Sequence, residues 1–297
     1  MRMELSVSAK ASAVQTCRVC GHESAMPRIG VRGDGKAVRK CLQCGCSTLD
    51  VELTPETVAS FYSNSYFSEE HPAYFTNLEE QVADPTNLAN LLLDRLAAFV
   101  NLNGARFLDI GCAAGVLLAA ARNRGADVLG LEISESAAEM ARNIFGVKVL
   151  CGRLEDHSLP AATFDVVCMI DVIEHVLWPR KDMEIASRIL KKGGILCLLT
   201  PNFRTYRIFG ERWHGFNASY EHILYFDRNS LTTLINQYGC KPVCFDTYGM
   251  VSLVEYYLPA LSRILPLQVE RLATRAFSKA LRAFGSEHRL LMIAQKS

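Results

Sequence analysis

The sequence predicts an α/β protein whose main domain is a largely parallel sheet with helices on both faces. Three observations lead to this fold class. Strand and helix patterns alternate from about residue 87 to residue 200, which is typical of strands joined by helical crossovers. A glycine-containing turn, "DIGCAAG", directly follows the first strand of this region. Ahead of the alternation, two closely spaced cysteine pairs indicate a small additional lobe.

Length and composition are those of an ordinary globular protein. The chain has 297 residues, of which 49% are hydrophobic, which is enough for one main domain and a small satellite. No apolar run approaches the roughly 20 residues that cross a bilayer, and "MRMELSVSAKASAVQ" lacks the apolar centre of a signal peptide. We therefore expect a cytoplasmic protein whose eleven cysteines are reduced.

Residues 1–50 are predicted to form a zinc ribbon. The segments "CRVCGH" and "CLQCGC" contain two CxxC pairs, each followed by glycine: Cys17, Cys20, Cys41 and Cys44. One tight turn can present both sulfurs of such a pair to a tetrahedral ion, and four thiolates leave no open position, so the zinc is expected to be structural. The competing interpretation is four ordinary thiols in a small core. His22 and Cys46 lie near enough in the sequence to compete as ligands.

This N-terminal lobe is basic. Eight Lys or Arg residues and only three acidic residues fall within residues 1–46, whereas the whole chain has a net charge of +1. A solvated basic face is the preferred interpretation, and contact with RNA is the alternative. Because the remainder of the chain is net acidic, the charge argues against a nucleic-acid surface over the whole protein.

Residues 51–86 are predicted to be a linker or lid. The segment "TPETVASFYSNSYFSEEHPAYF" is aromatic and polar without a clean period, which favours a short helix from about Pro55 followed by a loop. The main domain is expected to begin at residue 87. There, "NLANLLLDRLAAFV" repeats apolar residues at helical spacing and predicts a helix over Asn87–Val100.

The alternating region predicts five strands and three helices. The strands are Arg106–Ile110, Asp127–Glu132, Lys148–Cys151, Phe164–Ile170 and Ile195–Thr200, and the helices lie near 114–124, 134–145 and 180–191. The end of the chain differs from this alternation. "RNSLTTLINQYG" predicts a helix that Gly239 ends, whereas "KPVCFDTYG" and "HRLLMIAQK" predict two more strands.

A helical insert is predicted between the last two strands, at about residues 249–285. Its apolar residues Val269, Leu272, Ala276, Leu281 and Phe284 share one face, while Arg271, Arg275, Lys279 and Arg282 share another. The preferred interpretation is a stripe that packs on the core beneath a solvated basic face. The alternative is peripheral contact with a membrane surface or a lipid-linked substrate.

The turn in "FLDIGCAAG" is suited to an adenosine-containing ligand. Gly111 and Gly115 let the backbone bend from the strand that carries Asp109 into a helix that starts at the ligand. The second strand ends in "VLGLEIS", which places Glu132 where a carboxylate can accept hydrogen bonds from both ribose hydroxyls.

Four segments, "DIGCAAG", "GLEIS", "LPAATFDVVCMIDVIEHV" and "LKKGGILCLLTPN", resemble class I S-adenosylmethionine-dependent methyltransferases, in particular the branch with the ubiquinone-pathway O-methyltransferases. The resemblance covers residues 87–297. The CxxC pairs, "FYSNSYF" and "SYEHILYF" further resemble bacterial members with an N-terminal zinc ribbon, many of them linked to sugars, glycans or secondary metabolites. This resemblance implies a Rossmann-like sheet of seven strands, the last of them antiparallel.

The resemblance also implies a set of cofactor-binding residues. Those bordering the methionine part are Asp109, Gly111 and Gly115; those at the ribose and adenine are Glu132, Ile133, Leu154 and Glu155; and those at the amino-acid end are Ile170 and Asp171. Ala113 stands where the family usually has glycine, and we interpret it as a tolerated small residue.

Two segments contain candidates for the base that removes a proton from the acceptor. His175 follows the carboxyl end of the fourth strand, where open sheets bind ligands, although Glu174 and His175 could instead merely cap a helix. Tyr220, Glu221 and His222 lie in the loop after the fifth strand, and in similar zinc-containing sugar C-methyltransferases a comparable Glu-His pair serves the acceptor site. Trp213 and Phe216 are interpreted as core residues in preference to an apolar wall of the site.

The sequence thus predicts an S-adenosylmethionine-dependent methyltransferase for a small-molecule, sugar or glycan-intermediate acceptor, with O-methylation favoured over C-methylation. One alternative is an RNA base methyltransferase that grips RNA through the basic ribbon. Against it, "TPN" does not match the Asn/Asp-Pro-Pro-Tyr/Phe motif of enzymes that methylate amino groups. The other alternative is a binding protein that keeps the cofactor without catalysis. The acceptor and the oligomeric state are not defined by the sequence.

Overall fold

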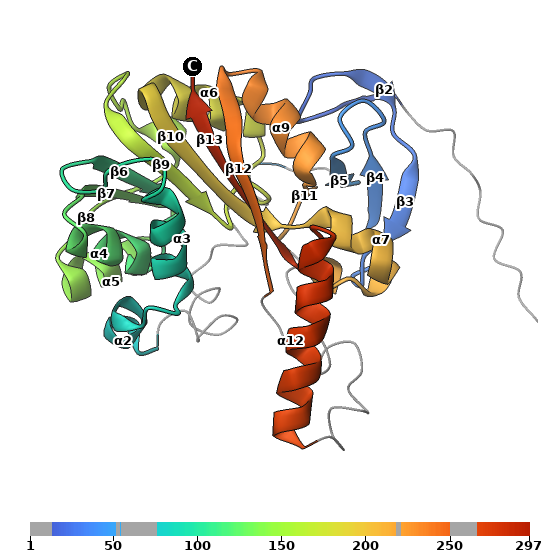
Figure 1. Cartoon of the computed structure of the whole chain (residues 1–297). Helices are drawn as coiled ribbons and strands as arrows, with labels where there is room; N and C mark the ends of the chain where they lie inside the picture. Colours follow the sequence, from blue (N-terminus) through green and yellow to red (C-terminus); the bar gives the residue numbers. More distant parts are fainter. Residues whose placement is uncertain (1–13, 52–53, 55–75, 218–220, 250–265) are drawn as a thin grey trace, which may run out of the picture.

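The computed structural model describes residues 14–51, 54, 76–217, 221–249 and 266–297 (Figure 1). Its centre is a seven-stranded sheet in the order β12-β13-β10-β9-β6-β7-β8. The strands are β6 (Arg106–Ile110), β7 (Asp127–Glu132), β8 (Lys148–Cys151), β9 (Phe164–Ile170), β10 (Leu190–Pro201), β12 (Cys240–Tyr248) and β13 (Arg289–Lys296). β13 runs antiparallel to both of its neighbours, β10 and β12, whereas the other paired strands of this sheet are parallel, which confirms the predicted fold class.

The strand order creates a switch point between β6 and β9. From β6 the chain proceeds outward to β7 and β8, and then returns to the other side of β6 to form β9 and β10. Helices that leave β6 and β9 therefore diverge, and a crevice opens beyond the carboxyl ends of these two strands.

Apolar residues on both faces explain why the central strands form. β9 and the second half of β10 are almost fully buried, as expected for parallel strands covered on both sides. One face packs against α3 (Leu88–Leu96), α4 (Val116–Asn123) and α5 (Glu135–Phe145). The other face packs against α6 (Pro179–Ile189) and α9 (Arg228–Asn236). Local signals fix several helix starts, since Asn87, Ser134 and Asp227 cap α3, α5 and α9.

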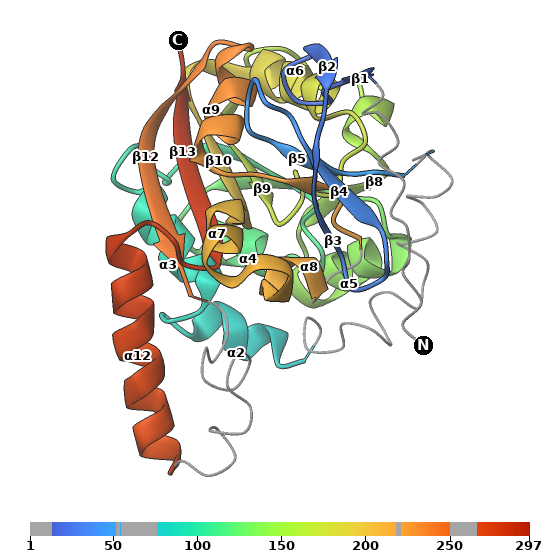
Figure 2. The ribbon, with the colours of Figure 1, turned by 90° about the vertical axis from the view of Figure 1, so that its right-hand side faces the viewer.

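The N-terminal ribbon shares a sheet with the main domain. Its strands are β1 (Val14–Thr16), β2 (Glu23–Ala25), β3 (Arg28–Val31), β4 (Ala37–Lys40) and β5 (Ser47–Leu49). β1 pairs with β2, whereas β3, β4 and β5 continue into β11 (Leu224–Tyr225), which comes from the loop after β10. Figure 2 shows these ribbon strands crossing in front of the main sheet. Cysteines of the ribbon also lie in the same apolar cluster as α6 and α9.

Several boundaries differ from the sequence-based expectations. The helix predicted over Asn87–Val100 ends at Leu96, and β10 begins at Leu190 because the glycine-containing "KKGG" segment forms an irregularity inside the strand. α2 (Leu78–Ala83) lies within the segment predicted as a linker. The helix predicted from about Pro55 lies outside the described residues.

Short helical turns follow β8 and β10: η3 (Leu154–Asp156), η4 (Phe203–Thr205), α7 (Tyr206–Phe209), η5 (Gly210–Arg212) and α8 (His214–Asn217).

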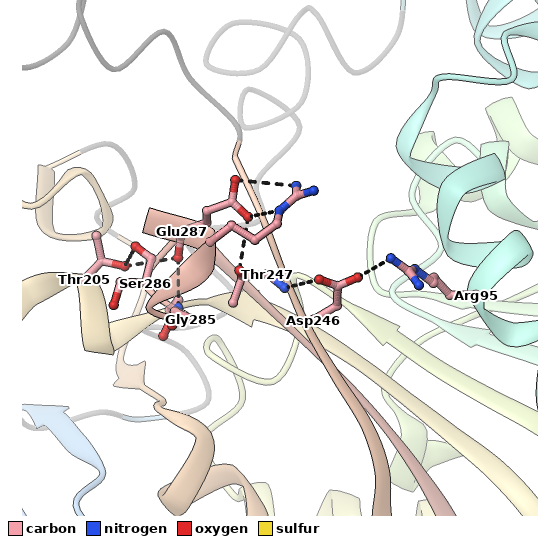
Figure 3. Close-up of polar contacts among 9 residues, drawn as sticks. Arg95, Thr205, Asp246, Thr247, Gly285, Ser286 and Glu287 are labelled. Carbon is pink, nitrogen blue, oxygen red and sulfur yellow. Dashed lines mark hydrogen bonds and ion pairs between the residues drawn. The ribbon is translucent and has the colours of Figure 1, made fainter. Parts of the chain in front are cut away.

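The helical insert contains α12 (Leu267–Ala283), which projects beyond the edge of the sheet (Figure 1). Its C-terminal end is anchored by Glu287, which is 2% exposed and accepts hydrogen bonds from Arg282 at 2.7 Å and Thr247 at 3.1 Å. Figure 3 shows this network, with the Arg95–Asp246 ion pair beside it.

The expectation that the apolar stripe of α12 packs on the core is wrong. Leu281 is buried, but Val269 is 46%, Leu272 68% and Phe284 70% exposed. The physical reason is that the anchoring contacts lie at one end of the helix, so most of its length is left projecting from the sheet. None of the helices within the described residues is long and apolar enough to span a membrane.

Candidate functional site

A cavity of about 790 Å³ lies at the switch point of the main sheet. Its walls come from the turns after β6, β7, β8 and β9, with α3, α8 and the start of β13 completing it. Ligand pockets are typically about 300–1,000 Å³, so the cavity is large enough for a cofactor together with a small acceptor.

The turn after β6 is shaped by residues with a left-handed backbone. Gly111 and Gly115 have φ of 72° and 83°, and Ala113 also lies in this region at φ 45°. A Cβ at Gly111 would lie 2.4 Å from Val172 Cγ2, so a larger residue there would displace the loop after β9. The backbone therefore approaches the cavity closely at this turn.

Glu132 closes this turn from the end of β7. It is 4% exposed, and its carboxylate accepts hydrogen bonds from the backbone N–H of Ala113 at 2.8 Å and of Ser134 at 2.9 Å. Burial raises the pKa of Glu132, while these backbone hydrogen bonds oppose the shift. The carboxylate thus joins the two turns that border the cavity.

The surroundings of Asp109 indicate what kind of ligand fits the cavity. It is 2% exposed, and its Oδ1 has no hydrogen-bond partner among the described residues. Burial raises its pKa well above the ordinary value, and the charge of Glu132 adds to this shift. A buried acceptor left without a donor is costly, so the site suits a ligand that presents N–H, O–H or positive charge. S-adenosylmethionine has these features in its ammonium, sulfonium and ribose groups.

The predicted cofactor residues converge on this one cavity. Eight of the nine line it: Asp109, Gly111, Glu132, Ile133, Leu154, Glu155, Ile170 and Asp171. Gly115 instead lies behind the wall as the N-cap of α4. Glu155 forms an ion pair with Arg153, the N-cap of η3, and another with Lys181, which joins η3 to α6.

Sequence reasoning missed Arg289, which lies at the start of β13. It is 6% exposed, lines the cavity and forms an ion pair with Asp171. His214 and His288 also line this end of the cavity. No motif marks these three residues, and only the pairing of β13 with β10 brings Arg289 beside the end of β9.

Glu174, His175 and His222 also line the cavity, and Glu174 and His175 lie in the loop after β9, which is two strands away from β7 in the sheet. Polar atoms of the three side chains lie within 4.8 Å of one another, and all three are buried. Glu174 Oε2 accepts a hydrogen bond from Thr200 at 3.0 Å. Burial raises the pKa of Glu174 well above its ordinary value, and the charge of Asp171 contributes. Burial also lowers the pKa of His222 well below its ordinary value. A neutral imidazole at His222 can therefore accept a proton here, and a neutral carboxylic acid at Glu174 can donate one.

The structure decides between some of the alternatives that the sequence leaves open for these side chains. Glu174 and His175 do not cap a helix, because α6 begins at Pro179 and its N-cap is Trp178. Trp213 and Phe216 are fully buried in a cluster with Phe203, which agrees with their interpretation as core residues. Glu221 is buried but does not line the cavity, and Tyr220 lies outside the described residues.

The four paired cysteines lie together in the ribbon. The sulfurs of Cys17 and Cys44 are 3.7 Å apart, as are those of Cys20 and Cys41, and all four lie within 4.8 Å of one another. A zinc ion bonded to four sulfurs at about 2.3 Å would place neighbouring sulfurs about 3.8 Å apart, so the spacing fits. Cys46 is not part of this group, since its sulfur lies 3.6 Å from the carbonyl oxygen of Tyr225.

The sheet order and the cavity at its switch point define the fold of class I S-adenosylmethionine-dependent methyltransferases. A methyltransferase-domain family model matches residues 77–244, which is more than half of the chain. The chain therefore belongs to this methyltransferase family.

Relatives and solved structures agree with this assignment. The chain is 30% identical over 130 residues to the ubiquinone biosynthesis O-methyltransferase of Coxiella burnetii, a match that covers 41% of this chain and 56% of that protein. It spans about half the length of such curated relatives. A SAM-dependent methyltransferase from Archaeoglobus fulgidus is 18% identical, with a TM-score of 0.51 over 75% of this chain and 100% of that one. One from Thermotoga maritima is 22% identical, with a TM-score of 0.50 over 78% and 97%. At these identities the structures establish a shared fold.

Proposed function

We propose that the protein transfers a methyl group from S-adenosylmethionine to an oxygen of a small-molecule acceptor. The observation that carries the proposal is one cavity that is lined both by acidic cofactor-type residues and by the Glu174, His175 and His222 cluster. The cofactor, when bound, supplies an electrophilic methyl group on its sulfonium. The similarity to ubiquinone biosynthesis O-methyltransferases favours oxygen as the methylated atom.

The residues of the chain have separate tasks in this proposal. Glu132 binds the ribose hydroxyls, Ile133 and Leu154 contact the adenine, and Asp109 and Asp171 face the amino-acid end. His222 is the first candidate to accept the proton of the acceptor hydroxyl, because its lowered pKa keeps the imidazole neutral, and His175 is the second. Because His175 and His222 are buried, bulk water is kept away from the proton that is transferred.

Methyl transfer can be tested with S-adenosylmethionine that is labelled in its methyl group. Purified protein would be incubated with hydroxylated aromatics, sugar nucleotides and RNA, and the product examined by NMR. We expect label in a methoxy group of a small molecule. Label on a sugar carbon would favour C-methylation, label in RNA would favour the base-methylation alternative, and cofactor binding without transfer to any acceptor class would favour a non-catalytic role.

We also propose that Cys17, Cys20, Cys41 and Cys44 bind one structural zinc ion. Elemental analysis of untagged protein should find one zinc per chain, and Cys41→Ser should lose the metal and lower the melting temperature, because metal binding is coupled to folding of the ribbon. Cys46→Ser is the matched control, since Cys46 is equally buried but lies outside the group. Metal-free protein with an intact ribbon would contradict the assignment.

The exposed apolar side of α12 supports peripheral contact with an anionic membrane surface. Val269, Leu272 and Phe284 are exposed, and Arg271, Arg275 and Lys279 are exposed on the same helix. Burying a large apolar side chain contributes about 1.5–3 kcal/mol, and each cation near anionic lipid about 1 kcal/mol. Such a contact would suit a lipid-linked acceptor, because the chain reaches cavity residues His288 and Arg289 shortly after the end of α12 at Ala283.

Vesicle flotation can test this contact. The protein should bind mixed phosphatidylcholine and phosphatidylglycerol vesicles, and Leu272→Glu should weaken binding by about tenfold or more. Ile144→Glu, a change at an exposed apolar residue of α5, should have no effect. Equal loss in both variants, or a dimer that Leu272→Glu dissociates, would contradict the membrane contact.

A further inference from the structure

The ribbon reaches the candidate acceptor site through one buried arginine. Arg32 follows β3 and is 2% exposed. Its guanidinium donates to Asp34 through Nε at 3.0 Å and through Nη2 at 2.6 Å. The remaining nitrogen, Nη1, donates to the backbone carbonyl oxygen of His222 at 2.8 Å and also lies 3.4 Å from the hydroxyl of Tyr225. The ribbon therefore contacts the same residue that is the first candidate for the base.

The segment that carries His222 is held between the ribbon and the main sheet. The backbone N–H of Leu49 in β5 donates to the carbonyl oxygen of Ile223 at 3.0 Å. On the other side, the N–H groups of Ile223 and Leu224 both donate to the carbonyl oxygen of Glu174 at 3.0 Å. These bonds fix the chain after His222, whereas Arg32 binds the carbonyl of His222 itself.

The guanidinium of Arg32, with its fork of N–H donors, is suited to orienting His222 and not only to supporting its backbone. Its pairing with Asp34 fixes the plane of the guanidinium, so the third nitrogen points in one direction. The His222 ring lies 4.8 Å from the His175 ring, centroid to centroid, with Nδ1 3.4 Å from the carbonyl oxygen of Gly215. A shift of the His222 backbone would change both contacts, and displacements of about 1 Å at a catalytic group are costly.

We propose that Arg32 is a positioning residue for His222, so that the N-terminal ribbon is a working part of the acceptor site. The inference rests on the proposed function, in which His222 accepts the acceptor proton. It also explains why the ribbon shares a sheet and an apolar core with the main domain through β11.

The titration of His222 gives a readout at the side chain itself, and the charged groups around it set its pKa. The groups that face the imidazole are Glu174 and His175 from the loop after β9, His214 from α8, Tyr225 from β11, and Arg32 from the ribbon. Burial is the largest cause of the lowered pKa of His222, with His175, Arg32 and His214 adding to it. Removal of the Arg32 charge should therefore raise that pKa.

The experiment compares Arg32→Met with Arg39→Met in the full chain. Arg39 is a matched control, because it also pairs with an aspartate, Asp50, and donates to a backbone carbonyl, that of Met26, but within the ribbon. The His222 imidazole resonances would be assigned by their loss in His222→Gln and followed by NMR against pH. Zinc content and melting temperature would confirm that each variant is folded.

We expect Arg32→Met to move the His222 resonances and to raise the midpoint of their titration, with wild-type behaviour in Arg39→Met. Arg32→Lys keeps the charge without the fork, so it should keep the midpoint near the wild-type value but still move the His222 resonances and lower kcat. Once an acceptor that the protein methylates is identified, Arg32→Met should lower kcat with that acceptor about tenfold. The Kd for S-adenosylmethionine should stay within about twofold of the wild-type value.

The inference would be overturned by unchanged His222 resonances in Arg32→Met, by wild-type resonances and kcat in Arg32→Lys, or by an equal change in Arg39→Met. A wrong assignment of His222 as the base would give a different result. His222→Gln would then retain full methyl transfer, while Arg32→Met would still move the His222 resonances.

Discussion

Replacing His222 by Gln is expected to lower turnover by about a hundredfold or more and to leave the affinity for S-adenosylmethionine almost unchanged. Gln keeps much of the size of the side chain but cannot accept a proton from the acceptor hydroxyl. Because His222 clusters with Glu174 and His175 and is not among the proposed cofactor-binding residues, the proposed contacts of Ile133 and Leu154 with the cofactor are retained.

The pH dependence provides a second sign of the same role. Burial lowers the pKa of His222 below the ordinary value for histidine of about 6.5, so the neutral, proton-accepting form persists at lower pH. Turnover should therefore stay near its plateau at pH 6.5 and fall only in more acidic solution. His22→Gln, at an exposed histidine of the ribbon, is the control and should be as active as wild type. Full activity in both His222→Gln and His175→Gln would mean that positioning alone carries the transfer.

Replacing Glu132 by Ala is expected to weaken S-adenosylmethionine binding by about 1–3 kcal/mol. The change removes the proposed acceptor of the ribose hydroxyls and also leaves the backbone N–H groups of Ala113 and Ser134 without their partner. Isothermal titration calorimetry measures the change. Glu139→Ala, at an exposed acidic residue of α5, tests whether net charge alone explains the result. Equal affinities in wild type and Glu132→Ala would remove Glu132 from the cofactor site.

Much of the main domain could be predicted because its signals are local. Apolar runs of strand length gave the bounds of β6, β7, β8 and β9 without error. The turn residues and the acidic ends of strands also converge as expected, since parallel strands that meet at one edge bring their carboxyl ends together. Cys17, Cys20, Cys41 and Cys44 likewise follow from spacing alone.

The acceptor site could be predicted only in part: His175 and His222 follow from the sequence, whereas Arg289 and Arg32 depend on tertiary pairing. Arg289 is 118 residues from its partner Asp171, and Arg32 is 190 residues from His222. β11 has two residues, too few for any periodicity, yet it joins the ribbon to the main domain. The stripe on α12 illustrates the same limit, since amphipathic periodicity identifies an apolar face without indicating what that face contacts.

The most direct test of the central claim is calorimetric titration of the purified chain with S-adenosylmethionine, S-adenosylhomocysteine and NAD. A class I methyltransferase site with Glu132 at the ribose and Asp109 unpaired at the cavity predicts one molecule of S-adenosylmethionine or its demethylated product per chain, with micromolar-range affinity. It also predicts little or no binding of NAD. Tight binding of NAD together with no binding of S-adenosylmethionine would contradict the account.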